Sequence, residues 1–108
     1  MNLAHVAEVV ADVAQATPQP VALALARVEV VVLRSPWKEV GMTDDARGLY
    51  EGTFPSSSDD ELAQDPPEGT IYLVADNLQN KVDAKDVLLH EMAHALGLDE
   101  TEVAGLGL

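Results

Sequence analysis

Two histidines one helical turn apart, followed by a chain-reversing glycine, constrain this chain more than any other feature. Residues 90–100 read His-Glu-Met-Ala-His-Ala-Leu-Gly-Leu-Asp-Glu. On a helix, positions four apart lie on one face, about 6 Å apart along the axis. Gly97 is well placed to end that helix in the left-handed conformation. The pattern predicts a long helix that starts near Asp83, ends before Gly97 and presents His90 and His94 from one side.

The two sides of this helix differ in polarity. On a wheel centred on His90, the side chains of Asp83, Val87 and His94 fall within about 60°. The opposite arc carries apolar side chains: Ala84, Leu88, Leu89, Met92, Ala95 and Leu96. We therefore expect the apolar side to anchor the helix in the protein. Asp83, with Asp86 three residues on, resembles a capping box at its start.

Two imidazoles on one helical face can reach a single zinc ion, which predicts His90 and His94 as metal ligands. Glu91 lies about 100° round the helix from His90, too far to ligate, but able to reach a metal-bound water. The third ligand then comes from beyond the helix, where Glu100 is favoured and Asp99 is the competitor. Three protein ligands plus a water are typical of a catalytic zinc. The alternative is a pair of ordinary hydrogen-bonded helix histidines.

The rest of the chain alternates helical and extended segments. An amphipathic helix is expected over residues 2–16, capped by Asn2, and a short one from Pro20 to Arg27. Strands are expected at 28–33 and 70–75, with a short strand or turn at 49–51. Valines on both faces of 28–33 predict that both faces are covered. Residues 55–69 read as a polar acidic loop, and Asp99 caps a last short helix. No repeat is visible, so residues 1–108 are read as a single domain.

Composition limits the partners and the location. Six basic against nineteen acidic residues give a net charge of −13, which argues against nucleic acid and anionic membranes as partners. There is no cysteine, which excludes disulfides and thiolate sites. No secretory signal or membrane-spanning run is visible, so we expect a cytoplasmic monomer. Aromatic residues make up 4%, so the core is expected to rest on valine, leucine and alanine.

Several further residues have a functional and a structural interpretation. The hydroxyl of Tyr50 or Tyr72 could donate a hydrogen bond to a developing oxyanion, but either ring is expected to be structural. Trp37 is expected to be a packing residue of a loop, and His5 a residue on a helix surface. The acidic cluster at 56–61 is read as a solvated loop, with a gate over the site as its alternative.

The chain resembles the minimal zincin-like metallopeptidases of bacteria. The resemblance rests on residues 90–100, on Gly-Leu-Tyr-Glu-Gly at 48–52 and on the expected strand at 71–74. It implies a small α+β domain, with about three mixed strands packed against helices and zinc held on the last long helix. It also implies ligand roles for His90 and His94 and a general-base role for Glu91. Family members usually carry aspartate where this chain has Glu100.

The resemblance implies a zinc-dependent peptidase that acts on a peptide or protein substrate. Zinc would polarise the scissile carbonyl, and Glu91 would take the proton of the attacking water. By analogy, the strand at 70–75 would form an edge that pairs with an extended peptide. One alternative is a zinc-binding interaction or regulatory module with little peptidase activity. Another is a small metal-dependent ribonuclease, against which the net charge of −13 and Glu91 both argue.

Overall fold

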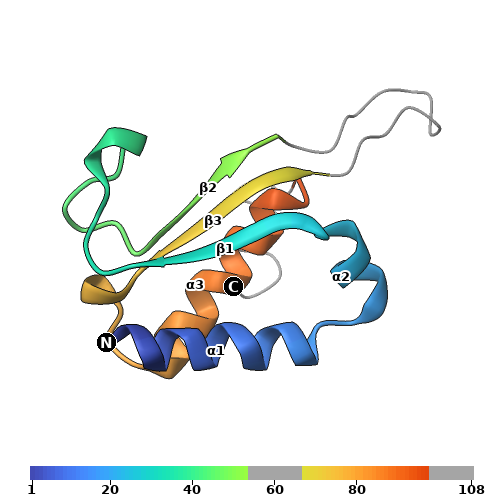
Figure 1. The fold of residues 1–108 in the computed structure, drawn as a ribbon, viewed down its shortest axis with the longest axis horizontal. Helices are drawn as coiled ribbons and strands as arrows, with labels where there is room; N and C mark the ends of the chain where they lie inside the picture. The colour runs from blue at the N-terminus through green and yellow to red at the C-terminus, as the bar shows by residue number, and fades with distance from the viewer. Residues whose placement is uncertain (54–66, 98–108) are drawn as a thin grey trace.

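The computed structural model describes residues 1–53 and 67–97. In these two ranges the chain forms α1 (Leu3–Ala16), α2 (Gln19–Ala24), β1 (Arg27–Leu33), the 3-10 helix η1 (Lys38–Val40), β2 (Gly48–Gly52), β3 (Glu68–Val74), the 3-10 helix η3 (Ala75–Asn77) and α3 (Lys81–Ala95). The strands form a three-stranded mixed sheet that packs against the helices (Figure 1). This arrangement confirms the predicted α+β class.

Strand β3 lies in the centre of the sheet, whose order is β1-β3-β2. It runs parallel to β1, with Ile71 opposite Val30, and antiparallel to β2, with Ile71 opposite Tyr50. The expectation that residues 70–75 form a pairing edge is therefore wrong, because both edges of β3 are already hydrogen-bonded. Among the described strands, β1 and β2 are the edges.

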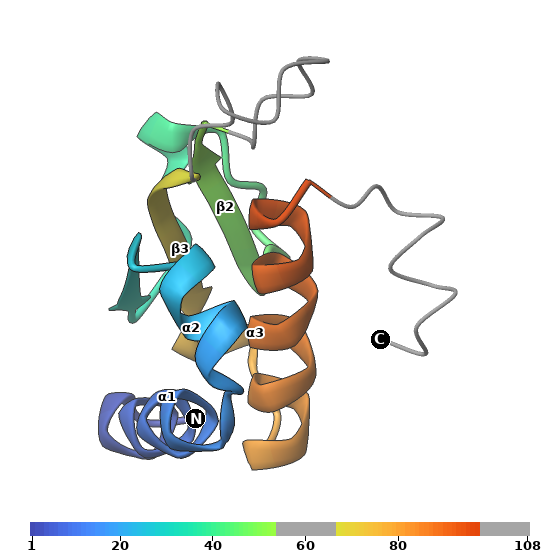
Figure 2. The same cartoon turned by 90° about the vertical axis from the view of Figure 1, so that its right-hand side faces the viewer.

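The α-helices of the described residues all lie on one face of the sheet (Figures 1 and 2). As a result, β1 alternates between a half-buried face, with Val28, Val30 and Val32, and an exposed face, where Val31 is 36% exposed. The expectation that both faces of this valine-rich run are covered is wrong, since no described α-helix packs on the second face. None of the helices in the described ranges is long and apolar enough to cross a membrane.

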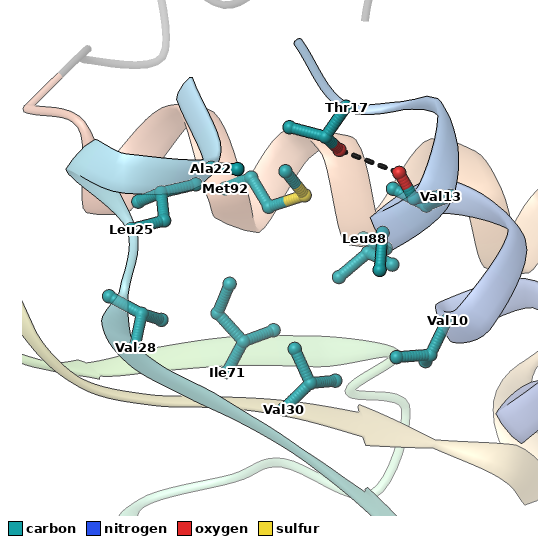
Figure 3. A pocket seen from close by; sticks show the side chains of 11 residues that line it. Val10, Val13, Thr17, Ala22, Leu25, Val28, Val30, Ile71, Leu88 and Met92 are labelled. Atoms are coloured by element: carbon teal, nitrogen blue, oxygen red, sulfur yellow. Dashed lines mark hydrogen bonds between the residues drawn. The ribbon is translucent and has the colours of Figure 1, made fainter. Parts of the chain in front are cut away.

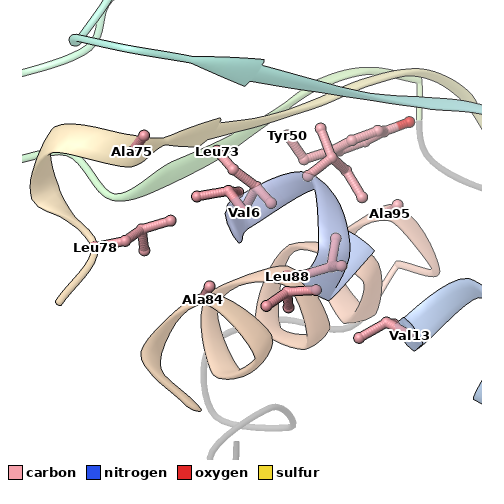
Figure 4. Close-up of a cluster of buried hydrophobic side chains, with 11 residues drawn as sticks. Val6, Val13, Tyr50, Leu73, Ala75, Leu78, Ala84, Leu88 and Ala95 are labelled. Atoms are coloured by element: carbon pink, nitrogen blue, oxygen red, sulfur yellow. The ribbon is translucent and has the colours of Figure 1, made fainter. Parts of the chain in front are cut away.

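The core lies between this sheet and the helices (Figure 4). Val6, Val9 and Val13 of α1 are buried there, together with side chains of β2, β3 and α3: Tyr50, Ile71, Leu73, Ala84, Leu88 and Ala95. Valine, leucine and alanine supply most of this cluster, as the composition predicts, and Ile71 and Tyr50 complete it.

The two N-terminal helices follow their local signals to different extents. The Asn2 side chain accepts a hydrogen bond from the His5 backbone nitrogen at 2.8 Å, which confirms the predicted cap of α1. Helix α2 ends at Ala24, earlier than the predicted Arg27. Arg27 instead begins β1, because it already pairs with Glu68 of β3. The β-sheet register therefore overrides the helical pattern at this point.

Helix α3 begins two residues before the predicted start. Its cap is Asn80, whose side chain accepts from the Asp83 backbone nitrogen at 2.9 Å. The Asp83 carboxylate accepts in return from the Gln79 backbone nitrogen at 3.0 Å, so Asp83 is the third helical residue and not the cap. At the other end Gly97 has φ 91°, which confirms its predicted left-handed conformation. The loop predicted at 55–69, apart from its last residues, and the last short helix lie outside the described residues.

Candidate functional site

The two histidines of α3 point toward each other. Their Nε2 atoms are 3.0 Å apart, and the ring centroids are separated by 4.6 Å at an interplanar angle of 78°. His90 and His94 are both partly buried. At this distance one Nε2 donates to the other, with the roles set by the tautomers. The spacing of four residues thus brings two imidazole nitrogens to one point beside the helix.

This nitrogen pair fits a zinc ion in spacing and in chemistry. Zinc–nitrogen bonds of about 2.0–2.1 Å put two nitrogens that share a tetrahedral ion about 3.3 Å apart. The observed 3.0 Å between the Nε2 atoms of His90 and His94 differs from this value by a few tenths of an ångström. Imidazole is also a common protein ligand of zinc. Small rotations of the two rings would therefore suffice for both to hold one ion.

Glu91 lies on the side of α3 that packs against β2. Strand β2 approaches the helix closely at Gly48, where a β-carbon would lie 3.3 Å from the Glu91 Cγ and 2.6 Å from the Val87 Cγ1. A side chain at position 48 would push the strand away from the helix. The glycine therefore sets the distance between an edge strand and the carboxylate that follows His90.

A cleft of about 500 Å³ opens where α3 meets the start of β2. Its walls include His90 and Glu91, together with five further residues: Arg47, Gly48, Asp83, Asp86 and Val87. The volume is within the range of ligand-binding clefts. Of the three residues that the helical wheel places beside His90, Asp83 and Val87 line the cleft and His94 does not.

Arg47 and Asp86 are cleft residues that the sequence reasoning missed. Arg47 Nη1 forms an ion pair with Asp83 Oδ1 at 3.0 Å, which links the segment before β2 to the first turn of α3. Nothing in the local sequence indicates this contact, because the two residues are 36 positions apart. Asp86 lies about 40° round the helix from His90, so the wheel carried a signal for it. With Asp83, Asp86 and Glu91 against one guanidinium, the walls of the cleft are predominantly acidic.

The expected third ligand lies outside the described residues. Glu100 and its competitor Asp99 both follow Gly97, where the described range ends. Within residues 1–53 and 67–97, no group of three histidine, cysteine, aspartate or glutamate side chains is close enough to hold a metal ion. The described part of the chain therefore supplies two converging nitrogens and the neighbouring Glu91.

The two tyrosines have structural contacts away from this cleft. The Tyr50 hydroxyl donates to the Thr53 carbonyl and is 3.5 Å from the Glu68 carbonyl. Burial raises the pKa of the Tyr50 phenol above its ordinary value. The Tyr72 ring packs edge-on against Trp37, with centroids 5.9 Å apart. Neither tyrosine lines the cleft, and Trp37 is a packing residue as expected.

The other two sequence candidates also lie away from the cleft or beyond the described residues. His5 is exposed on α1, as expected. The acidic cluster at 56–61, with its alternative as a gate, lies outside the described residues.

No protein-family model matches the sequence, and no curated protein matches it. Any functional assignment therefore rests on the residues and geometry of the site itself.

Proposed function

We propose that this chain is a zinc-dependent peptidase with its site at His90, Glu91 and His94. The observation that carries this proposal is the approach of the two Nε2 atoms to 3.0 Å at the edge of a cleft that Glu91 also lines. The resemblance of residues 90–100 to the metal-binding motif of the minimal zincin-like metallopeptidases supports the same assignment.

In this proposal His90 and His94 hold zinc through their Nε2 atoms. Glu100 is the proposed third ligand, with Asp99 as the alternative, because Gly97 ends α3 in the left-handed conformation and both carboxylates follow it within three residues. When bound, zinc supplies a Lewis acid that polarises the scissile carbonyl and lowers the pKa of a bound water toward about 7. The two histidines also fix the position of the reacting groups relative to Glu91.

Glu91 acts as the general base in this mechanism. Its carboxylate takes a proton from the attacking water and passes it to the leaving amine, so that the peptide bond breaks without release of an amine anion. Its neighbour on β2 is Gly48, whose lack of a side chain lets the strand pack close to this carboxylate. The acidic wall formed by Asp83 and Asp86 favours neutral or basic peptides.

The proposed partner of the substrate backbone is β2. Its outer edge has no pairing strand among the described residues, and its first residue, Gly48, packs against Val87 and Glu91 of α3. An extended peptide added to this edge would gain main-chain hydrogen bonds while its scissile bond lies near Glu91. This assignment replaces β3, which is paired on both sides.

Metal analysis combined with peptide-library digestion tests the proposal. We expect one zinc per wild-type chain, loss of zinc in His90→Ala and weaker zinc binding in Glu100→Ala. His5→Ala is the matched control, since it removes an exposed histidine of α1 and should leave zinc and cleavage unchanged. A zinc-loaded chain that cleaves nothing in the library would favour the interaction module over the peptidase. A chain that binds no zinc would reject both.

A further inference from the structure

A second cavity lies on the side of α3 that faces away from the histidine pair. It has a volume of about 190 Å³, is partly open, and is lined by residues of α1, α2, β1, β3 and α3 (Figure 3). Leu88 and Met92 line it from α3, and Ala22 and Leu25 from α2. Its lining has no charged side chain, and its only side-chain hydroxyl, that of Thr17, already donates to the Val13 carbonyl at 2.6 Å. The cavity therefore suits an apolar group.

A second hollow adjoins this cavity and has a positive charge on its wall. The hollow has a volume of about 270 Å³ and shares Val13, Thr17 and Met92 with the cavity. Lys85 is the only charged side chain among the residues that line either space. Methionine is flexible, so the Met92 side chain can move without disturbing the helix.

Lys85 differs from the neighbouring lysine on the same helix. Lys81 forms an ion pair with Glu8 of α1, with Nζ 2.9 Å from the carboxylate. No ion pair of the described residues includes Lys85, which is exposed beside the hollow. A free ammonium at the end of an apolar groove is complementary to a ligand with an apolar chain and an anionic head.

We propose that these two spaces bind a single medium-chain carboxylate, with its chain in the apolar cavity and its head at Lys85. A cavity of about 150 Å³ is known to take up benzene, so the larger cavity here has room for at least about six carbon atoms. Further carbons would cross the hollow toward the ammonium, so the alkyl chain is longer than these six carbons. The protein has a net charge of −13, so the carboxylate head of the ligand adds little to the affinity. The apolar alkyl chain supplies most of it.

Titration with octanoate, below the concentration at which it forms micelles, tests the proposal. We expect saturable binding of one octanoate per chain. The methyl NMR signal of Met92 should move during the titration, whereas that of Met42, which is buried but lines neither space, should not. Absence of saturable binding, or equal movement of both methyl signals, would overturn the proposal without requiring any variant.

Matched variants then test the head-group contact and the alkyl-chain contact of the ligand separately. Lys85→Gln should weaken octanoate binding about two- to fivefold, as for an exposed ion pair, and leave the binding of 1-octanol unchanged. Lys81→Gln makes the same change in net charge on the same helix and should alter neither. Ala22→Phe, at an exposed position of α2 that lines the cavity, should abolish the binding of both compounds. Equal effects of the two lysine variants, or octylammonium that binds as tightly as octanoate, would contradict the proposed head-group contact.

Discussion

Gly48 of β2 lies so close to Glu91 of α3 that a β-carbon at position 48 would be 3.3 Å from the Glu91 Cγ. The same β-carbon would be 2.6 Å from the Val87 Cγ1 and 3.2 Å from the Tyr72 carbonyl oxygen. An edge strand can therefore approach the proposed general base only because this position has no side chain. This contact joins the Gly-Leu-Tyr-Glu-Gly segment to the histidine motif, although the two are separated by some forty residues of sequence.

Gly48→Ala should destabilise the protein by about 1–3 kcal/mol, because the added methyl overpacks the contact between β2 and α3. Urea denaturation measures the change in the free energy of unfolding. The double variant Gly48→Ala/Val87→Ala removes the Val87 Cγ1 that the new methyl meets, so its cost should be smaller than the sum of the two single costs. Strict additivity of the two costs would argue against this contact.

Asn80→Ala should destabilise the protein by about 1 kcal/mol, since it leaves the Asp83 backbone nitrogen without its capping oxygen. Asn80→Asp keeps a capping acceptor and is the matched control, with an expected change of a few tenths of a kcal/mol. Thermal and urea unfolding followed by circular dichroism provide both values. Equal losses in the two variants would mean that the amide of Asn80 acts through some contact other than the cap.

The sequence was sufficient for features that depend on neighbouring residues. Asn2 as a cap, Gly97 as a left-handed terminator and the meeting of His90 with His94 all follow from spacings of a few residues. Three errors have a common cause. The end of α2, the uncovered face of β1 and the edge assigned to β3 each depend on which strands pair and where the helices lie.

The same distinction between local and long-range contacts applies to the candidate site. His90, Glu91 and the Asp83 side of the helix can be read from helical periodicity. Arg47 enters the cleft from a segment 36 residues before its partner Asp83, and no local pattern indicates that approach. The N-terminus of α3 was misplaced because Asp83 and Asn80 are both good capping residues. Only the hydrogen bonds identify Asn80 as the cap and Asp83 as its reciprocal acceptor.

Alkaline pH should destabilise the fold through Tyr50. Burial raises the pKa of its phenol above the ordinary value of 10.0, so the folded protein holds this proton more tightly than the unfolded chain. Tyr50 therefore contributes its full stability below about pH 10, and that contribution is lost as the pH rises through the folded-state pKa. Urea denaturation between pH 8 and 11 measures the loss. Tyr50→Phe should flatten this part of the pH profile, and an unchanged profile in that variant would assign the loss to other groups.

Zinc should stabilise the folded chain increasingly as its free concentration rises above the dissociation constant. If the native state alone binds the ion, a free zinc concentration one hundred times the dissociation constant adds about 2.7 kcal/mol to the free energy of unfolding. Urea denaturation with zinc and with a chelator measures this difference. The increase should disappear in His90→Ala and persist in His5→Ala. An equal increase in both variants would place the bound zinc away from the two converging imidazoles.

Glu91→Gln tests whether Glu91 acts as the general base or as a zinc ligand. The amide has nearly the size of the carboxylate but cannot accept the proton of the attacking water, so kcat/KM for peptide hydrolysis should fall about 10²- to 10⁴-fold. Zinc stoichiometry should remain that of the wild type, because His90 and His94 are unchanged. Glu29→Gln, at an exposed position of β1 on the other edge of the sheet, makes the same change in charge and should retain activity. Loss of zinc in Glu91→Gln would make Glu91 a ligand, and full activity in that variant would remove it from the mechanism.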